Sequence, residues 1–196
     1  MPDAPAPRDE LPTTIGAVLL AAGEGRRFGG ASHKLLAPWR GRPLYTSAIE
    51  VATEARVGPV MVVTGSARLR LPVGVVEIHN PHWRDGQATS LAAAVVFARA
   101  AGWSAIVVGL ADQPGIDPSA WRAVAASSAP IACANYDGAR RNPVRLDNVI
   151  WPLLPTTGDE AARAVMRMRP DLVEDVTCNG QPADIDTVED LARWSS

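Results

Sequence analysis

The sequence predicts an α/β fold in which a mainly parallel central sheet lies between two layers of helices. Between residues 15 and 127, short apolar runs typical of buried strands alternate with segments of helical periodicity. Strands that alternate with helices form largely parallel sheets with right-handed crossovers. The length of 196 residues suits one core, so we expect a single domain over residues 15–196. Residues 1–14 are polar and proline-rich, which predicts a disordered tail.

The first two thirds of the chain carry the clearest signals. Buried strands are predicted at Ile15–Leu20, Pro59–Thr64, Val73–Ile78 and Ser104–Leu110. Helices are predicted at Pro43–Arg56, Leu91–Ala101 and Asp117–Ser127. Asp117 followed by Pro118 offers an N-cap and a first helical residue. The helix at 91–101 is apolar nearly all round, so we expect it to be buried.

Beyond residue 130 the pattern is looser. Strands at Pro130–Tyr136 and Pro143–Leu146, joined by a turn at Asp137-Gly138, indicate a hairpin that adds an antiparallel strand. A helix is predicted near Gly158–Met168 and a final one after Thr187. In the first of these we expect the arginines to form a solvated face, namely Arg163, Arg167 and Arg169.

Composition excludes several functional classes. The net charge of −2 and the pI of about 5.9 speak against a nucleic acid or an anionic membrane as partner. No apolar run reaches the length of a membrane span, and no signal peptide is recognisable, so we expect a cytoplasmic protein. Cys133 and Cys178 lack metal-site spacing and are expected to be reduced. The histidines share no motif and are expected on the surface or in loops, namely His33, His79 and His82.

The stretch after the first strand has the composition of a loop that binds a polyphosphate. Small residues at Ala22, Gly23, Gly25 and Gly29 allow a backbone to approach a ligand, and successive amides form a nest for anions. Arg26, Arg27 and Lys34 add the cations that a triphosphate requires, namely point charges and forked donors. The dinucleotide and P-loop motifs are both unmet, because Phe28 replaces the third glycine of the former and Leu35 follows Lys34. The alternative is a surface loop with solvated arginines.

A second loop, Asn80–Leu91, precedes the helix at 91–101. Gly86 permits close approach, while Thr89 and Ser90 stand at the mouth of the helix, where hydroxyls cap amides or face a ligand. An ordinary helix cap with Trp83 in the core is the alternative.

One aspartate has the position of a metal ligand, and a second one has no structural role that the local sequence explains. Asp112 lies just past the most apolar strand, after Ala111, and because Asp117 already caps the next helix, Asp112 is free to hold a hard cation. Near the carboxyl end, Thr187 and Asp190 form a capping pair that leaves Asp186 unexplained.

These stretches resemble the MobA-like nucleotidyltransferases. Leu20–Leu44 is similar to the pattern L-A-[AG]-G-x-[SG]-x-R-x-G, then K, then G-x-P-L. Asn80–Leu91 resembles N-P-x-W-x-x-G-[MQ]-x-x-S-L, and Asp184–Leu191 resembles D-I-D-T-x-E-D-L. Ala22 makes the chain most similar to the molybdenum cofactor cytidylyltransferases (MocA-like). Asn142 and Ala161 depart from the pattern, since a histidine and a glycine are usual there.

The resemblance implies a three-layer, Rossmann-like nucleotidyltransferase fold and a Mg²⁺-dependent enzyme. It would transfer CMP from CTP to the phosphate of molybdopterin cofactor and release pyrophosphate. The absence of an activated nucleophile agrees with direct displacement at phosphorus. The resemblance implies catalytic roles for Arg27, Lys34 and Asp112, and a metal held by Asp112 and Asp186, with Asp184 as the alternative ligand.

The resemblance and the two loops together indicate which residues bind the nucleotide. The set is Leu20, Ala21, Ala22, Gly23, Gly25, Arg27, Gly29, Lys34, Gly65, Gly86, Thr89, Ser90, Ala111 and Asp112. Two other functions stay open. One is a guanylyltransferase or another transferase from a nucleoside triphosphate to a phosphate. The other is a non-catalytic carrier or chaperone that hands the cofactor to a molybdoenzyme.

Overall fold

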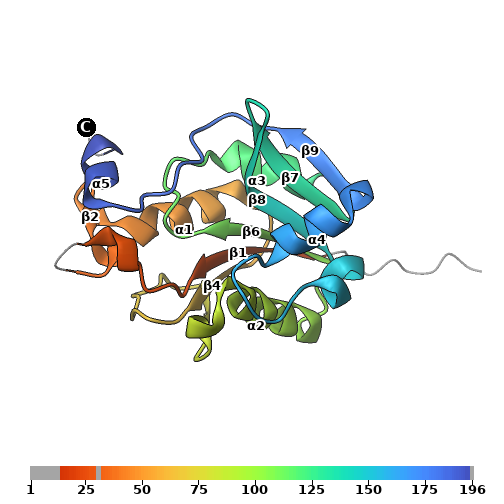
Figure 1. Ribbon diagram of the computed structural model, residues 1–196, viewed down its shortest axis with the longest axis horizontal. Coiled ribbons are helices and arrows are strands. Elements are labelled where there is room, and N and C mark those ends of the chain that lie inside the picture. Colours follow the sequence, from red (N-terminus) through yellow and green to blue (C-terminus); the bar gives the residue numbers. More distant parts are fainter. Residues whose placement is uncertain (1–13, 30–31, 195–196) are drawn as a thin grey trace, which may run out of the picture.

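The computed structural model describes residues 14–29 and 32–194, and within these ranges seven strands form one sheet (Figure 1). The order across the sheet is β5-β4-β1-β6-β8-β7-β9. The strands are β1 (Ile15–Ala21), β4 (Val60–Thr64), β5 (Val76–His79), β6 (Ala105–Leu110), β7 (Ile131–Tyr136), β8 (Ala139–Asp147) and β9 (Val173–Thr177). β8 is antiparallel to β6 and β7, and the other pairs are parallel. The predicted mainly parallel sheet and its antiparallel hairpin are therefore confirmed.

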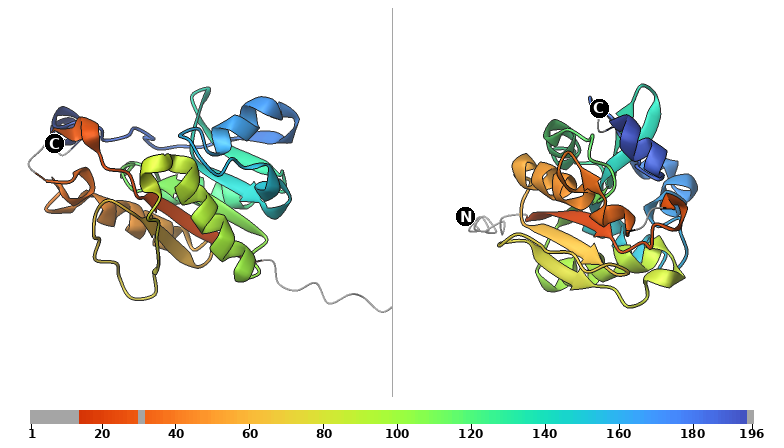
Figure 2. Two further views of the ribbon diagram at one scale, coloured as in Figure 1. Left: turned by 60° about the horizontal axis from the view of Figure 1, so that its bottom comes forward. Right: turned by 90° about the vertical axis from the view of Figure 1, so that its left-hand side faces the viewer.

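Helices cover both faces of this sheet (Figures 1 and 2). α1 (Leu44–Ala55) and α3 (Pro118–Ala125) pack on one face, while α2 (Gln87–Ala100) and α4 (Ala162–Met168) pack on the other. The central strands are apolar on both sides because successive side chains point to opposite faces: in β1, Leu19 contacts the first layer and Leu20 the second. The structure thus has the three layers that the sequence predicts.

Some predicted boundaries were wrong. α2 begins at Gln87, four residues before the predicted start, so Thr89 and Ser90 lie in its first turn. The prediction that this helix is buried all round was also wrong, because Val96 is 69% exposed on its outer face. The third strand is short, since β5 starts only at Val76. Of the predicted tail at 1–14, only Thr14 lies within the described residues.

Two strand pairings were not predicted. β9 reads Val-Glu-Asp-Val-Thr and pairs with β7 on one side only, so its apolar content is low for a strand of this sheet. β2 (Pro38–Trp39) and β3 (Arg42–Pro43) form a two-residue hairpin too short to leave a periodic signal.

The carboxyl-terminal segment returns to the open edge of the sheet. After β9 it runs along residues 111–116, where Ile185 N donates to Asp112 O at 3.1 Å. It then forms α5 (Val188–Trp194), whose predicted capping pair is confirmed: Asp190 N donates to Thr187 Oγ1 at 3.1 Å. Figure 2 shows α5, in dark blue, beside the orange β2–β3 region. A small apolar cluster joins them, made of Phe28, Ala37, Trp39, Leu44 and Ile185 with Leu191 and Trp194.

In the part of the chain that the structure describes, no helix combines the length and the apolar character needed to span a bilayer. Cys133 is buried and Cys178 is half-buried, and both are free thiols. Burial raises the pKa of the Cys133 thiol to about 11, which leaves it protonated at neutral pH.

The cap of α3 gives a first prediction. The Asp117 side chain accepts a hydrogen bond from Ser119 N at 2.7 Å, and its hydrogen bonds with Ser119 lower the pKa of this carboxyl. We expect Asp117→Ala to lower the free energy of unfolding by about 1 kcal/mol at pH 7, measured by urea denaturation. A lowered folded-state pKa stabilises the fold above the unfolded pKa, so the difference should shrink below about pH 4. Asp117→Asn, which keeps an acceptor, is the control; an equal loss in both variants would contradict the cap.

Candidate active site

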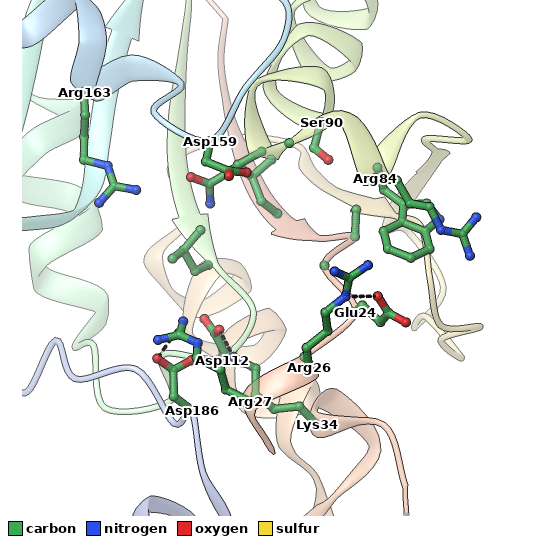
Figure 3. Close-up of a pocket in the computed structure, with 18 residues that line it drawn as sticks. Glu24, Arg26, Arg27, Lys34, Arg84, Ser90, Asp112, Asp159, Arg163 and Asp186 are labelled. Carbon is green, nitrogen blue, oxygen red and sulfur yellow. Dashed lines mark hydrogen bonds and ion pairs between the residues drawn. The ribbon is translucent and has the colours of Figure 1, made fainter. Parts of the chain in front are cut away.

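A cavity of about 520 Å³ opens where the carboxyl ends of β1 and β6 lie side by side (Figure 3). Parallel sheets bind ligands at this edge. Ten of the residues predicted for the site line the cavity, namely Leu20, Ala22, Gly23, Gly25, Arg27, Lys34, Gly86, Ser90, Asp112 and Asp186. The structure therefore brings together residues from four separate stretches of the sequence.

Two side chains form hydrogen bonds to the backbone of the glycine loop after β1. Ser66 Oγ donates to Gly23 O at 2.7 Å, and His33 Nε2 lies 3.0 Å from the same carbonyl. Since His33 Nδ1 accepts from Leu35 N, Nε2 carries the proton and is the donor. The description of His33 as a surface or loop residue is incomplete, because this half-buried ring braces the loop.

Gly25 lets Lys34 approach the loop. Its φ of 68° lies in the left-handed region, and a Cβ there would meet Lys34 Cβ at 2.9 Å. A larger residue at this position would combine backbone strain with a collision, so the close approach depends on glycine.

Lys34 joins the two aspartates that were predicted as metal ligands. Its Nζ lies 2.5 Å from Asp112 Oδ2 and 3.0 Å from Asp186 Oδ1. Arg27 Nη2 contacts the other oxygen of Asp186, Oδ2, at 3.0 Å. Burial alone would lower the pKa of Lys34, but the charge of Asp112 and hydrogen bonds to both carboxylates raise it instead. Lys34 is therefore a positively charged, buried group at the cavity floor.

The two carboxylates also suit a divalent cation. Asp112 Oδ1 is buried without a hydrogen-bond partner, so one acceptor of this residue is unsatisfied. The described residues contain no cluster of three or more His, Cys, Asp or Glu side chains that could hold a metal. Mg²⁺ needs no such cluster, because it usually takes one or two carboxylates and fills its remaining positions with water and substrate phosphates. The pair Asp112 and Asp186 fits that requirement.

Asp184, the alternative ligand, has a different partner. Its Oδ1 accepts from Gln113 Nε2 at 2.7 Å. Partial desolvation, and then the like charges of Asp112 and Asp186, raise the pKa of this carboxyl, although the residue as a whole is exposed. The charges of both aspartates therefore act on Asp184, but its hydrogen bond goes to Gln113 and not to Lys34.

The opposite side of the cavity is formed by the start of α2 and a loop that docks on it. Gly86 has a φ of 104°, and a Cβ there would meet Gly158 C at 2.3 Å. Ala88 N donates to Gly158 O at 2.8 Å, and Gly158 N donates to Asp85 O at 2.8 Å. These contacts fix the loop that carries Asp159 beside the start of α2.

Five predicted nucleotide-binding residues do not line the cavity. They are Ala21, Gly29, Gly65, Thr89 and Ala111. Ala21 and Ala111 are buried in the core on the α1 and α3 side, so their side chains do not reach the cavity. Thr89 Oγ1 is occupied: it accepts from Asn80 Nδ2 at 2.8 Å and lies within donating distance of two carbonyls. Gly65 packs beneath the loop, since a Cβ there would meet Ala22 O at 2.7 Å.

Arg26, expected from the composition of the loop but not assigned to the site, also lines the cavity. Seven further lining residues were missed in the sequence, namely Glu24, Trp83, Arg84, Gln87, Leu110, Asp159 and Arg163. Two of the arginines have local partners. Arg26 Nε lies 2.6 Å from Glu24, and Arg84 stacks on the Trp83 ring at 4.4 Å.

Arg163 differs from its neighbours in and after α4. Arg167 pairs with Glu160 and Arg169 with Asp171, as expected of a solvated face. Among the described residues the Arg163 guanidinium has neither a hydrogen bond nor an ion pair, and Figure 3 shows it across the cavity from Arg26. The expectation of a solvated face is therefore incomplete for Arg163, which is exposed but lines the cavity. Helical spacing gave no signal for Asp159 and Arg163, because Asp159 lies in the loop before α4, which begins at Ala162.

Solved structures share this fold across nearly the whole chain. Rv0371c from Mycobacterium tuberculosis superimposes with a TM-score of 0.80 at 23% identity, covering 94% of this chain and 99% of that one. It has also been solved in complex with manganese. A nucleotidyl transferase from Methanothermobacter gives a TM-score of 0.76 at 21% identity, with 93% and 96% of the two chains covered. The inositol-1-phosphate CTP transferase from T. maritima gives 0.70 at 14% identity, with 91% of each chain covered.

At these identities the structural likeness establishes the fold alone. A search of curated proteins found no match. The profile of the MobA-like NTP transferase domain, however, matches residues 17–176, which span both walls of the cavity and Asp112. The chain thus belongs to the family of MobA-like NTP transferase domains.

Proposed function

We propose that this protein transfers CMP from CTP to the phosphate of a molybdopterin-type cofactor and releases pyrophosphate. One observation carries the proposal: Lys34 meets Asp112 and Asp186 on the floor of a cavity bounded by a glycine loop. A buried cation and two carboxylates beside exposed amides form a suitable environment for a metal-bound triphosphate. Membership of the family supports a nucleotidyl transfer reaction.

The choice of CTP and of the acceptor rests on narrower support. Ala22, within the motif after β1, is the residue that makes the chain resemble cytidylyltransferases. One structural neighbour is by name a CTP transferase that acts on inositol 1-phosphate, so the fold accommodates cytidylyl transfer to a phosphate. A guanylyltransferase with the same architecture is the main alternative.

Each part of the cavity would have its own role. The loop at Gly23–Arg27 would receive the triphosphate through its amides, and Arg27 and Lys34 would neutralise the leaving pyrophosphate. Mg²⁺, held by Asp112 and Asp186, would draw charge from the phosphate oxygens as the transition state forms. An acceptor phosphate is already ionised at neutral pH, so the site needs no strong general base. Catalysis would then consist of positioning and electrostatics.

We propose that Arg163 contacts the acceptor. Its guanidinium, which forms no hydrogen bond or ion pair with the described residues, lies on the α4 side of the cavity, away from the glycine loop. A planar fork of donors matches the oxygens of a phosphate group. The two walls would thus bind the two phosphate-bearing substrates from opposite sides.

Thermal unfolding with different nucleotides tests the proposal directly. With Mg²⁺ present, we expect CTP to raise the melting temperature more than GTP, ATP or UTP, because a ligand that binds only the folded state stabilises it. A larger shift with GTP would assign the protein to the guanylyl branch. Binding of free molybdopterin cofactor without any nucleotide response would favour the carrier function instead.

The two aspartates should act as one unit. We expect Asp112→Asn and Asp186→Asn each to lower kcat at least about 100-fold, and the double variant to be scarcely worse, because both remove the same metal site. Initial rates of pyrophosphate release provide the measurement, with melting temperatures as the folding control. Multiplicative losses in the double variant, or full activity of Asp112→Asn in saturating Mg²⁺, would contradict a shared metal.

Two glycines in the same loop form a matched pair. Gly25 and Gly29 both have positive φ, but a Cβ at Gly29 would meet nothing within 4 Å, whereas at Gly25 it would meet Lys34. Both alanine variants carry similar backbone strain, at most about 1–3 kcal/mol. We expect only Gly25→Ala to weaken CTP binding strongly, as measured by calorimetry. Equal losses would mean that the strain of the loop matters, and the approach of Lys34 does not.

A further inference from the structure

The position of Asp186 depends on a segment with little regular structure. Residues 178–187 connect β9 to α5, and the isolated bridge between Gly180 and Ile116 is the one β-pairing recorded in this described segment. Two backbone hydrogen bonds tie the segment to the loop after β6: Gln181 N donates to Gly115 O at 3.0 Å and Ile185 N to Asp112 O at 3.1 Å. The residues between Gln181 and Ile185 need a further contact to fix their conformation.

The side chain of Gln113 provides this contact. Its Nε2 donates to Pro182 O at 3.1 Å and to Asp184 Oδ1 at 2.7 Å, so one amide group contacts the middle of the span twice. Its Oε1 accepts from Asn142 Nδ2 at 3.0 Å, which ties the amide to β8. Gln113 is 3% exposed, and because its donors and acceptor are all engaged, the amide has one favourable orientation.

This arrangement gives two nearby carboxylates, Asp184 and Asp186, different partners. Asp184 is bonded to Gln113, whereas Asp186 reaches Lys34 and Arg27. On its other side Asp186 is held by the cap of α5, since its N donates to Asp190 Oδ2 at 3.2 Å. The backbone around Asp186 is thus fixed from both directions, by Gln113 before it and by Asp190 after it.

We propose that Gln113 is a positioning residue that holds residues 182–186 on the loop after β6, so that Asp186, and not Asp184, faces Asp112. The inference rests on the proposed function, because it concerns how the metal-binding carboxylates are presented. It also gives a structural role to Asn142, which stands where the family usually has a histidine, because Asn142 orients the Gln113 amide from β8.

The test uses Mn²⁺ as probe, with its binding to the CTP-saturated protein measured by the EPR signal of the free ion. Gln113→Met keeps the volume but removes the amide, and we expect it to weaken Mn²⁺ binding about tenfold, the lower end for partners that orient a metal ligand. CTP affinity without metal should not change. The metal concentration for half-maximal activity should rise, while kcat at saturating metal should largely recover. Gln181→Met is the matched control, since Gln181 is exposed in the same segment and should behave as the wild type.

A second pair of variants keeps the test valid if Gln113→Met folds poorly. Asp184→Asn and Asp184→Ala both remove the charge, but only asparagine retains an acceptor for Gln113. We expect Asp184→Ala to bind Mn²⁺ more weakly than Asp184→Asn. Equal affinities in this pair, or wild-type metal affinity in Gln113→Met, would overturn the inference. So would a loss in Asp184→Asn as large as that in Asp186→Asn, because Asp184 would then be a ligand.

The experiment gives different results if the proposed function is wrong and if only the role of Gln113 is wrong. If the wild type shows no CTP-dependent binding of Mn²⁺, both the proposed nucleotide and metal sites and this inference are wrong. If the wild type binds both and Gln113→Met matches it, only the positioning role of Gln113 is wrong.

Discussion

The site depends on one buried cation that must be paired. Lys34 is 9% exposed, and a charged ammonium group at that depth is tolerated only when opposite charges and hydrogen bonds replace water. Its partners lie 78 and 152 residues further along the chain. The fold therefore has to bring the first loop, the end of β6 and the segment before α5 to one point. Much of the architecture around the open edge of the sheet serves this convergence.

The sheet and the carboxyl-terminal segment achieve the convergence by different means. β1 and β6 are parallel neighbours, so the loops that follow them, with Lys34 and Asp112, meet at one edge. Asp186 reaches the same edge only because its segment lies along residues 111–116 and because Ile185 is buried with Trp39 and Leu44. The first arrangement follows from strand order. The second depends on side-chain packing and on the amide of Gln113.

The cavity is also asymmetric in charge. On the side of the glycine loop, Arg26, Arg27 and Lys34 are each joined to a carboxylate. On the side of α4, Arg163 has no such partner within the described part of the chain. A triphosphate would have to replace existing ion pairs, whereas a second anion would meet a guanidinium that forms no ion pair with the described residues. This difference is consistent with two phosphate-bearing substrates that bind to separate walls.

Local signals in the sequence determined the elements. The apolar runs of β1, β4 and β6, the Asp117 cap and the pair Thr187 and Asp190 all act over a few residues, so they can be read without the fold. The motifs also indicated Lys34, Asp112 and Asp186 as members of one site. Tertiary structure decided which side chains reach the cavity. Ala21 and Ala111 turn into the core, Thr89 is bonded within its own loop, and His33 and Gln113 brace segments far away in sequence. These contacts join residues that are distant along the chain, and their geometry depends on packing between whole layers, which local periodicity does not encode.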